Sequence, residues 1–171
     1  MTIQDPNNYW EQLERLEKLI RASELKAGVV FSFHSLILGI FVDRLKTLSH
    51  LFEDGIIPMI GIICWIFFVL LSIFYCFKCF KPQIERNYEK NVFFFSDAVY
   101  KFGSIEEYTE HLIEICGSQQ KLYEQLGQQI HAESKIIDNK FKCVHNSIKY
   151  FAISFVFVVL IILYWILTMF A

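Results

Sequence analysis

Two groups of polar residues in this 171-residue chain are of types that could bind an anion or the edge of a nucleobase. The first group is Glu24-Leu25-Lys26-Ala27, which stands at the start of an uncharged stretch. The second lies within LGQQIHAESKIIDNKF, on overlapping faces of a predicted helix, and its members are Gln128, Gln129, His131, Ser134, Lys135, Asn139 and Lys140. Amide, hydroxyl, imidazole and ammonium groups supply donors for such ligands. The alternative is a solvated helix face near a membrane surface, with Lys26 only anchoring its helix at the headgroups.

A single histidine, His34, lies in the middle of the first uncharged stretch. Ionisable groups inside membranes are often functional, so His34 is a candidate for a proton-sensitive gate. The alternative is a neutral ring that hydrogen-bonds a neighbouring helix. The same stretch carries small residues one helical turn apart, a spacing that permits close helix packing. These residues are Gly28 with Ser32, and Ser35 with Gly39.

No catalytic motif is present in the sequence. There is no glycine-rich phosphate loop, no Gly-x-Ser-x-Gly and no His-Glu-x-x-His. Cys76 and Cys79 have the spacing of half a metal or redox motif, but no second cysteine pair or histidine pair accompanies them. We therefore predict a protein that is not an enzyme and that carries no metal or cofactor.

The elements that must position these residues are helices, and three of them are apolar enough for lipid. Residues 150–171 carry no charge, proline or glycine, and as a helix they are about 33 Å long, against about 30 Å for a hydrocarbon core. Residues 55–77 form a second uncharged stretch, and residues 27–42 form a shorter one that Lys26 and Arg44 can extend by snorkelling. A composition of 54% hydrophobic residues, with 18 Phe, agrees with a membrane protein.

Several helix boundaries follow from the pattern. Apolar spacing and the absence of proline predict one helix from about residue 10 to 42, and another that runs unbroken from about Leu122 into the last span as a stalk. Ser104 and Glu107 have the spacing of a capping box that starts a further helix. The aromatic-rich segment 91–102 is predicted to be a short buried or interfacial element.

Basic residues predict the orientation of the spans. Four precede the first span, two lie between the first and second, ten lie between the second and third, and none follows the third. Because cytoplasmic flanks carry the excess of Lys and Arg, the N-terminus and residues 78–149 are predicted to be cytoplasmic, with the C-terminus on the other side. The net charge of −2 gives no basic field for nucleic acid.

The predicted fold is therefore an all-α integral membrane protein with three transmembrane helices and a cytoplasmic helical stalk between the second and third. Its parts are an amphipathic N-terminal helix (1–26), transmembrane helix 1 (27–42), an external loop (43–54), transmembrane helix 2 (55–77), a cytoplasmic helical region (78–149) and transmembrane helix 3 (150–171).

Three segments resemble motifs of the Pycsar effector transmembrane protein family of bacterial antiphage defence. Glu24-Leu25-Lys26-Ala27 is similar to its acidic-x-Lys-Ala signature, with Glu where the family has Asp. The segment 91–97, NVFFFSD, is similar to its Asn/aromatic/Asp segment. The stalk motif is matched by Gln129-Ile130-His131 with Ser134, Ile136, Lys140 and Phe141. The order of the motifs and their placement relative to the spans also agree, over roughly residues 10–165.

The resemblance implies an effector in the cell inner membrane, with its C-terminus in the periplasm. A partner pyrimidine nucleotide cyclase would make cyclic UMP or cyclic CMP on infection, and the effector would form a homo-oligomer among the membrane lipids and impair the membrane, giving abortive infection. The nucleotide is the possible activating ligand: Lys135 or Lys140 would meet its phosphate, and Phe or Tyr would stack on its base. The candidate ligand-binding residues are Lys26, Gln129, His131, Ser134, Lys135 and Lys140. The candidates for helix packing or gating are Glu24, Gly28, Ser32, His34, Ser35 and Gly39.

Two other functions fit the same pattern. A structural or scaffolding membrane protein could use the stalk as a coiled coil that binds a helical partner. A small channel or transporter subunit is a weaker alternative, because His34 is almost the only ionisable or strongly polar side chain within the predicted spans.

Overall fold

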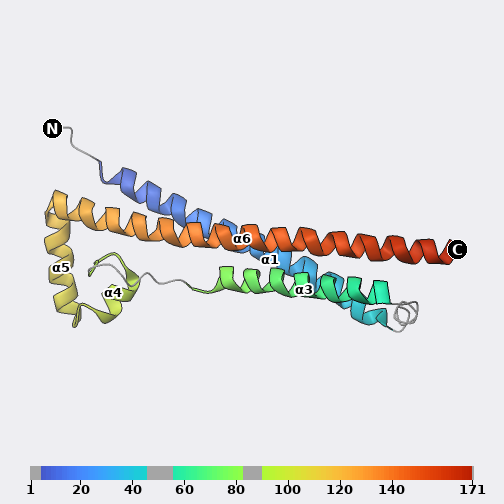
Figure 1. Ribbon diagram of the computed structural model, residues 1–171. Helices are drawn as coiled ribbons and strands as arrows, with labels where there is room; N and C mark the ends of the chain where they lie inside the picture. The colour runs from blue at the N-terminus through green and yellow to red at the C-terminus, as the bar shows by residue number, and fades with distance from the viewer. Residues whose placement is uncertain (1–4, 46–55, 83–89, 171) are drawn as a thin grey trace. The chain divides into compact units, whose positions relative to one another are not determined.

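A computed structural model describes residues 5–45, 56–82 and 90–170. Within these ranges the regular elements are all α-helices, so the all-α prediction is confirmed. The helices are α1 (Asn7–Asp43), α3 (Ile56–Phe80), α4 (Phe95–Tyr100), α5 (Ile105–Gly117) and α6 (Gln119–Phe170) (Figure 1). Gly55, the first residue of the predicted second span, and most of the predicted external loop lie outside the described residues.

Helices α1 and α6 are each continuous, as predicted. α1 joins the amphipathic N-terminal part to the first apolar stretch over 37 residues. α6 joins the predicted stalk to the last apolar stretch over 52 residues (Figure 1). Neither helix contains a proline, which would remove a backbone donor and break the ladder of hydrogen bonds. The polar and apolar parts of each helix are therefore joined within one helix and not by a loop.

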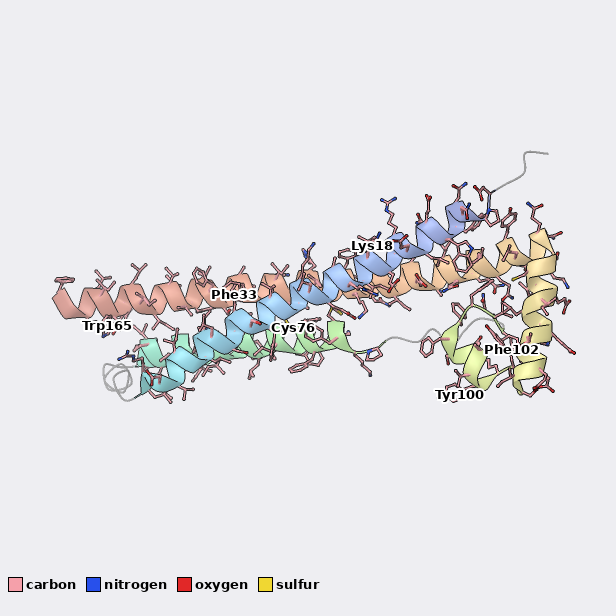
Figure 2. All side chains as sticks on the ribbon, turned by 180° about the vertical axis from the view of Figure 1, so that it is seen from behind. Lys18, Phe33, Cys76, Tyr100, Phe102 and Trp165 are labelled. Atoms are coloured by element: carbon pink, nitrogen blue, oxygen red, sulfur yellow. The ribbon has the colours of Figure 1, made fainter. Side chains whose placement is uncertain are left out.

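Three helices of the described chain, namely α1, α3 and α6, are long and apolar enough to cross a membrane. Their apolar parts keep large side chains exposed: Phe33 is 52% and Trp165 is 43% exposed (Figure 2). Such exposure is unfavourable in water but natural in lipid, where a helix also satisfies its own backbone hydrogen bonds. The chain is a membrane protein.

The chain divides into two compact units, each with its own interior. The first, here the polar unit, comprises Met1–Ala22 and Pro82–Asn139. The second, here the apolar unit, comprises Ser23–Lys81 and Lys140–Ala171. α1 and α6 each contribute one part to each unit.

Aromatic contacts join the segments of the polar unit. The rings of Tyr9 on α1 and Tyr123 on α6 are stacked with centroids 5.0 Å apart. The rings of Trp10 and Phe93 meet edge to face at 5.4 Å, which ties α1 to the segment before α4. Ring pairs in this geometry contribute about 0.5–1.5 kcal/mol beyond the area that they bury.

Helix α5 begins with the predicted capping box. The Ser104 hydroxyl accepts a hydrogen bond from the Glu107 amide at 3.3 Å, and Glu107 Oε2 accepts one from the Ser104 amide at 3.0 Å. Gly103 immediately before it has φ +77°, in the left-handed region. A side chain is strained in that conformation, so this turn between α4 and α5 requires glycine.

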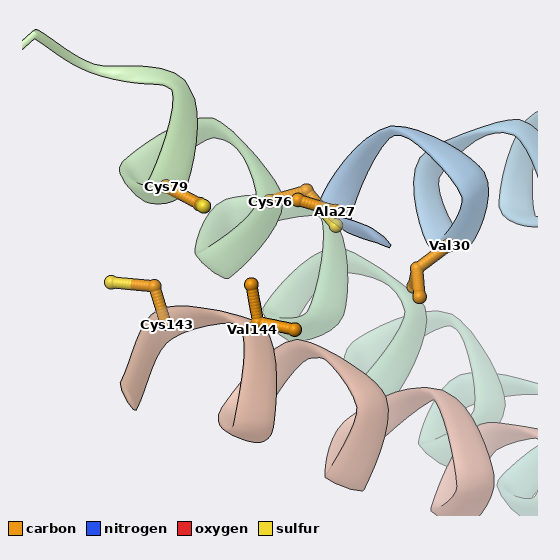
Figure 3. Close-up of a cluster of buried hydrophobic side chains, with 6 residues drawn as sticks. All are labelled: Ala27, Val30, Cys76, Cys79, Cys143 and Val144. Carbon is orange, nitrogen blue, oxygen red and sulfur yellow. The ribbon is translucent and has the colours of Figure 1, made fainter. Parts of the chain in front are cut away.

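The interior of the apolar unit is a seam between three helices. Near the cytoplasmic end predicted for the spans, Cys76 and Cys79 of α3 lie beside Cys143 and Val144 of α6, together with Ala27 and Val30 of α1 (Figure 3). Further along, a second cluster centres on Ile62, Trp65 and Val69 of α3. Between them the buried Ser72 hydroxyl donates to the Ser147 carbonyl of α6 at 2.8 Å.

Candidate functional site

The second polar group predicted from the sequence divides between two faces of α6. His131, Ser134 and Lys135 are exposed and line a shallow groove together with Asp138 and Asn139. These residues lie on one side of α6 because the other four follow His131 by three, four, seven and eight positions. The groove offers imidazole, hydroxyl and ammonium groups beside a carboxylate and an amide, so it contains both donors and acceptors.

Gln129 lies on the opposite, half-buried face of α6, in the polar unit. Its side-chain amide donates to Glu133 Oε1 at 3.2 Å. The remaining oxygens, Gln129 Oε1 and Glu133 Oε2, are buried without a hydrogen-bond partner among the described residues. Burial raises the pKa of the Glu133 carboxyl, the hydrogen bond from Gln129 opposes that shift, and the charge of Glu17 on α1 raises the pKa further. Burial in the polar unit therefore disfavours the charged form of Glu133.

Lys140 is not in the groove. Its side chain is 4% exposed and its ammonium nitrogen lies 2.8 Å from Glu24 Oε1 on α1. The same nitrogen donates to the Cys79 carbonyl of α3 at 2.6 Å. Three helices of the apolar unit thus meet at the Lys140 ammonium group. It pairs Lys140, predicted to bind ligand, with Glu24, predicted to act in helix packing or gating. Lys26, the basic residue of the first polar group, is exposed.

The inward position of Lys140 could have been found from the sequence. It stands three residues after Ile137 and four before Val144, both buried. This spacing places all three on one helical face. Lys140 is close to its polar neighbours along the chain, but the helical period places it on a different face from them.

Asn91, in the segment similar to the family's Asn/aromatic/Asp motif, is fully buried. Its side-chain nitrogen donates to the Gln125 carbonyl at 2.8 Å and to Gln128 Oε1 at 3.3 Å, and its side-chain oxygen accepts from the Phe93 amide at 2.9 Å. Its backbone amide donates to Asp97 Oδ2 at 3.1 Å. Of the segment 91–102, predicted to be buried or interfacial, the structure buries Asn91, Val92, Asp97 and Phe102, whereas Phe95, Val99 and Tyr100 are exposed.

Neighbouring bonds complete this network. The Val92 amide donates to Gln125 Oε1 at 3.0 Å, and the Tyr108 hydroxyl donates to the Val92 carbonyl at 3.2 Å. Lys101 Nζ lies 2.9 Å from Asp97 Oδ1. Asn91 therefore fastens the segment before α4 to α6, while Tyr108 ties that segment to α5. The role of Asn91 was not predicted, because its partners on α6 are distant in sequence.

The small residues of the first span lie mostly on an outer surface. Ser32, Ser35 and Gly39 are exposed, and the two serine hydroxyls donate to carbonyls of their own helix, four residues earlier. Gly28 is partly buried, and a methyl group there would lie 3.9 Å from the Phe80 ring, an ordinary contact. The packing role predicted for these residues stays a prediction.

His34 is 1% exposed in the apolar unit. Its ring meets the Phe151 ring edge to face, with centroids 5.0 Å apart. Its Nε2 atom has no hydrogen-bond partner among the described residues. His34 thus packs against an aromatic ring of α6, and both the gating role and the alternative of a hydrogen bond to a neighbouring helix stay predictions.

Among the described residues, no three His, Cys, Asp or Glu side chains are grouped so that they could hold a metal ion. Two contacts instead tie separate segments together: the Lys140 ion pair joins α6 to α1, and the Asn91 network joins the segment before α4 to α6. α1 and α6 continue without a break into the predicted spans. The fold and these contacts define an all-helical membrane protein whose polar helices continue into its spans.

A family model described as the Pycsar effector protein domain matches residues 8–167, and the chain belongs to that family. A similar relative is the Pycsar effector protein PtPycTM of Propioniciclava tarda, which is 28% identical over 148 residues. The match covers 81% of this chain and 69% of the relative. No solved structure matches the chain. The resemblance found in the sequence is confirmed, and family membership supports an effector role in Pycsar antiphage defence.

Proposed function

We propose that this chain is an inner-membrane effector that responds to a cyclic pyrimidine nucleotide, cyclic UMP or cyclic CMP, by assembling and impairing the membrane. A pyrimidine nucleotide cyclase is its functional partner and supplies the nucleotide on infection. Loss of membrane integrity then stops the infected cell before phage spread. The observation that carries the proposal is the family match over residues 8–167, which includes both the polar helices and all three candidate spans.

The proposed orientation of the chain in the membrane rests on its basic residues. Lys78 and Lys81 follow the second apolar stretch, and Lys140, Lys142 and Lys149 precede the third. This excess favours a cytoplasmic location for the N-terminus and for residues 78–149, and a periplasmic C-terminus. The groove on α6 then faces the compartment in which a cyclase would release its product.

The groove lined by His131, Ser134 and Lys135 is our candidate contact for the nucleotide. A cyclic nucleotide carries one phosphate charge, which an ammonium group and a hydroxyl can bind, and Lys135 and Ser134 are adjacent on this face. Lys140 is left out of the contact because its ammonium group already binds Glu24 and the Cys79 carbonyl. Since α6 is continuous, a change in how its polar part associates would reach the last span through the same backbone.

The test follows membrane potential with a dye in bacteria that express the chain together with a cyclase for cyclic UMP, cyclic CMP or cyclic AMP, or with no cyclase. We expect depolarisation with one pyrimidine nucleotide and none without a cyclase. Lys135→Ala should raise the nucleotide level required, whereas Lys142→Ala, an exposed lysine outside the groove, should not. Depolarisation without any nucleotide would contradict the proposal. An inserted protein that responds to no nucleotide would favour the scaffolding alternative.

A further inference from the structure

The ammonium group of Lys140 occupies a position where a charge is costly unless it is compensated. Only 4% of the side chain is exposed, and an unpaired ammonium in such a place loses its hydration without replacement. Two of its three N–H donors have oxygen partners: Glu24 Oε1 at 2.8 Å and the Cys79 carbonyl at 2.6 Å. Lys140 is therefore stable where it lies only while α1 and α3 stay beside it.

The carbonyl that Lys140 binds belongs to the last turn of α3, which ends at Phe80. The last four carbonyls of a helix have no partner within the helix, and this end carries the negative part of the helix dipole. Lys140 thus supplies from α6 a donor for the Cys79 carbonyl, and its positive charge adds to that of Lys78 in the last turn of α3. A single side chain of α6 compensates both the C-terminus of α3 and a carboxylate of α1.

The two members of the ion pair differ in their access to solvent. The Glu24 side chain is 40% exposed, ten times the exposed fraction of Lys140. If the pair separates, Glu24 can be hydrated where it is, but Lys140 cannot unless the helices move apart. Separation of the pair therefore drives the seam open from the side of α6.

We infer that Glu24 and Lys140 form a clasp that holds α1, α3 and α6 in one packing, and that its release opens the cysteine-lined end of the seam. Lys140 is a positioning residue in this inference: it acts through the helices that it joins. It stands before Tyr150 on the same unbroken helix, so release of the clasp frees the polar end of the third predicted span.

Native cysteines report on the clasp. Cys76, Cys79 and Cys143 are buried at this end of the seam, and Cys79 itself carries the carbonyl that Lys140 binds (Figure 3). Cys116 on α5 is exposed and lies in the polar unit. A maleimide should therefore react rapidly with Cys116 and slowly with the buried three, and mass spectrometry of peptides separates these sites.

The experiment measures maleimide labelling of the full chain in membranes, without nucleotide, for a set of matched variants. Glu24→Ala should increase labelling of Cys79 and Cys143 by about tenfold or more, because it leaves Lys140 buried and unpaired. Adding Lys140→Met to Glu24→Ala should bring labelling back towards the natural level, since the double variant no longer leaves a buried ammonium group unpaired. Lys142→Ala is the matched control and should leave labelling unchanged.

The rescue separates a clasp from general damage to the fold. If Glu24→Ala fails to insert, the milder Glu24→Gln is compared with Glu24→Gln/Lys140→Met in the same way. The inference would be overturned if Cys79 and Cys143 were labelled no faster in the single variant than in the natural chain. It would also be overturned if they were labelled as fast in the double variant as in the single one.

A second measurement connects the clasp to activity and rests on the proposed function. Glu24→Ala should depolarise cells at a lower nucleotide level than the natural chain requires, and Lys140→Met should reverse part of that shift. An increase in labelling without a change in threshold would leave the clasp as a structural feature and overturn its link to gating. The labelling result itself does not depend on any nucleotide, so it stands or fails separately from the proposed function.

Discussion

Replacement of Asn91 by alanine tests the network that fastens the segment before α4 to the stalk helix. The variant loses three side-chain hydrogen bonds: to the Gln125 carbonyl, to Gln128 Oε1 and from the Phe93 amide. The Gln125 carbonyl lies within α6 and keeps its helical bond, whereas the Phe93 amide loses its acceptor. At about 1 kcal/mol for each bond, we expect a loss of about 2–3 kcal/mol in the free energy of local opening.

Hydrogen–deuterium exchange measures this opening in the full chain. A loss of about 2–3 kcal/mol corresponds to roughly 30- to 160-fold faster exchange of the Val92 and Phe93 amides. The matched control is Asn139→Ala, because Asn139 is an exposed asparagine of α6. Exchange in α3 should be unchanged in both variants.

Asn91→Asp distinguishes hydrogen bonding from volume. The variant keeps an acceptor for the Phe93 amide and almost the same volume, but it replaces a donor by a carboxylate oxygen and places a second charge near Asp97. We expect exchange at least as fast as in Asn91→Ala. If both variants exchange no faster than Asn139→Ala, the network does not hold this segment and the argument is wrong.

Three further substitutions test other contacts. Glu133→Gln should stabilise the polar unit near neutral pH, because the raised pKa of the natural carboxyl means that its contribution to stability is present when it is protonated and is lost as pH rises through the raised value. The melting temperature of the natural chain in detergent should therefore fall more between about pH 5 and about pH 8 than that of the variant. Equal slopes would contradict this. Ser104→Ala should destabilise α5 by about 1 kcal/mol through loss of the capping box, seen as faster exchange at the start of α5 and rescued by Ser104→Asp; unchanged exchange would show that the cap is not needed. Ser72→Ala should lower the free energy of unfolding of the apolar unit by about 0.6–1.7 kcal/mol in a denaturation experiment in micelles, because it removes one interhelical hydrogen bond. Ser35→Ala is the control and should have little effect, because that hydroxyl bonds a carbonyl of its own helix. Equal losses in the two variants would argue against the interhelical bond.

The helices were largely predictable because their signals are local. Apolar spacing and the absence of proline predicted that α1 and α6 are continuous, and the spacing of Ser104 and Glu107 predicted the start of α5. Each of these features depends on residues within one or two turns of one another.

The contacts that organise the candidate site were harder to predict from the sequence, because they join residues far apart in the chain. Lys140 and Glu24 are separated by 116 positions, and Lys140 and the Cys79 carbonyl by 61. Helical period alone places Lys140 on the buried face but does not name its partners. One acceptor of the Asn91 side-chain amide is likewise distant in sequence, and it is a backbone carbonyl of α6, which carries no signal in the sequence.

The division of the second polar group has the same cause. Gln129 and His131 are two residues apart and therefore point to different sides of α6, one half-buried and the other exposed. Proximity in sequence suggested one ligand site, and helix geometry separates its members. The groove with Ser134 and Lys135 is the part that remains accessible to a ligand.

The most direct test of the central claim uses the purified chain alone in lipid vesicles loaded with a self-quenching dye. Cyclic UMP, cyclic CMP, cyclic AMP or buffer is added to vesicles whose protein orientation has been established by maleimide labelling of Cys116. The account predicts dye release with one cyclic pyrimidine nucleotide, little release with cyclic AMP or buffer, and a higher nucleotide requirement for Lys135→Ala. Inserted protein that releases no more dye with either pyrimidine nucleotide than with buffer would contradict the claim that this chain senses the nucleotide and impairs the membrane.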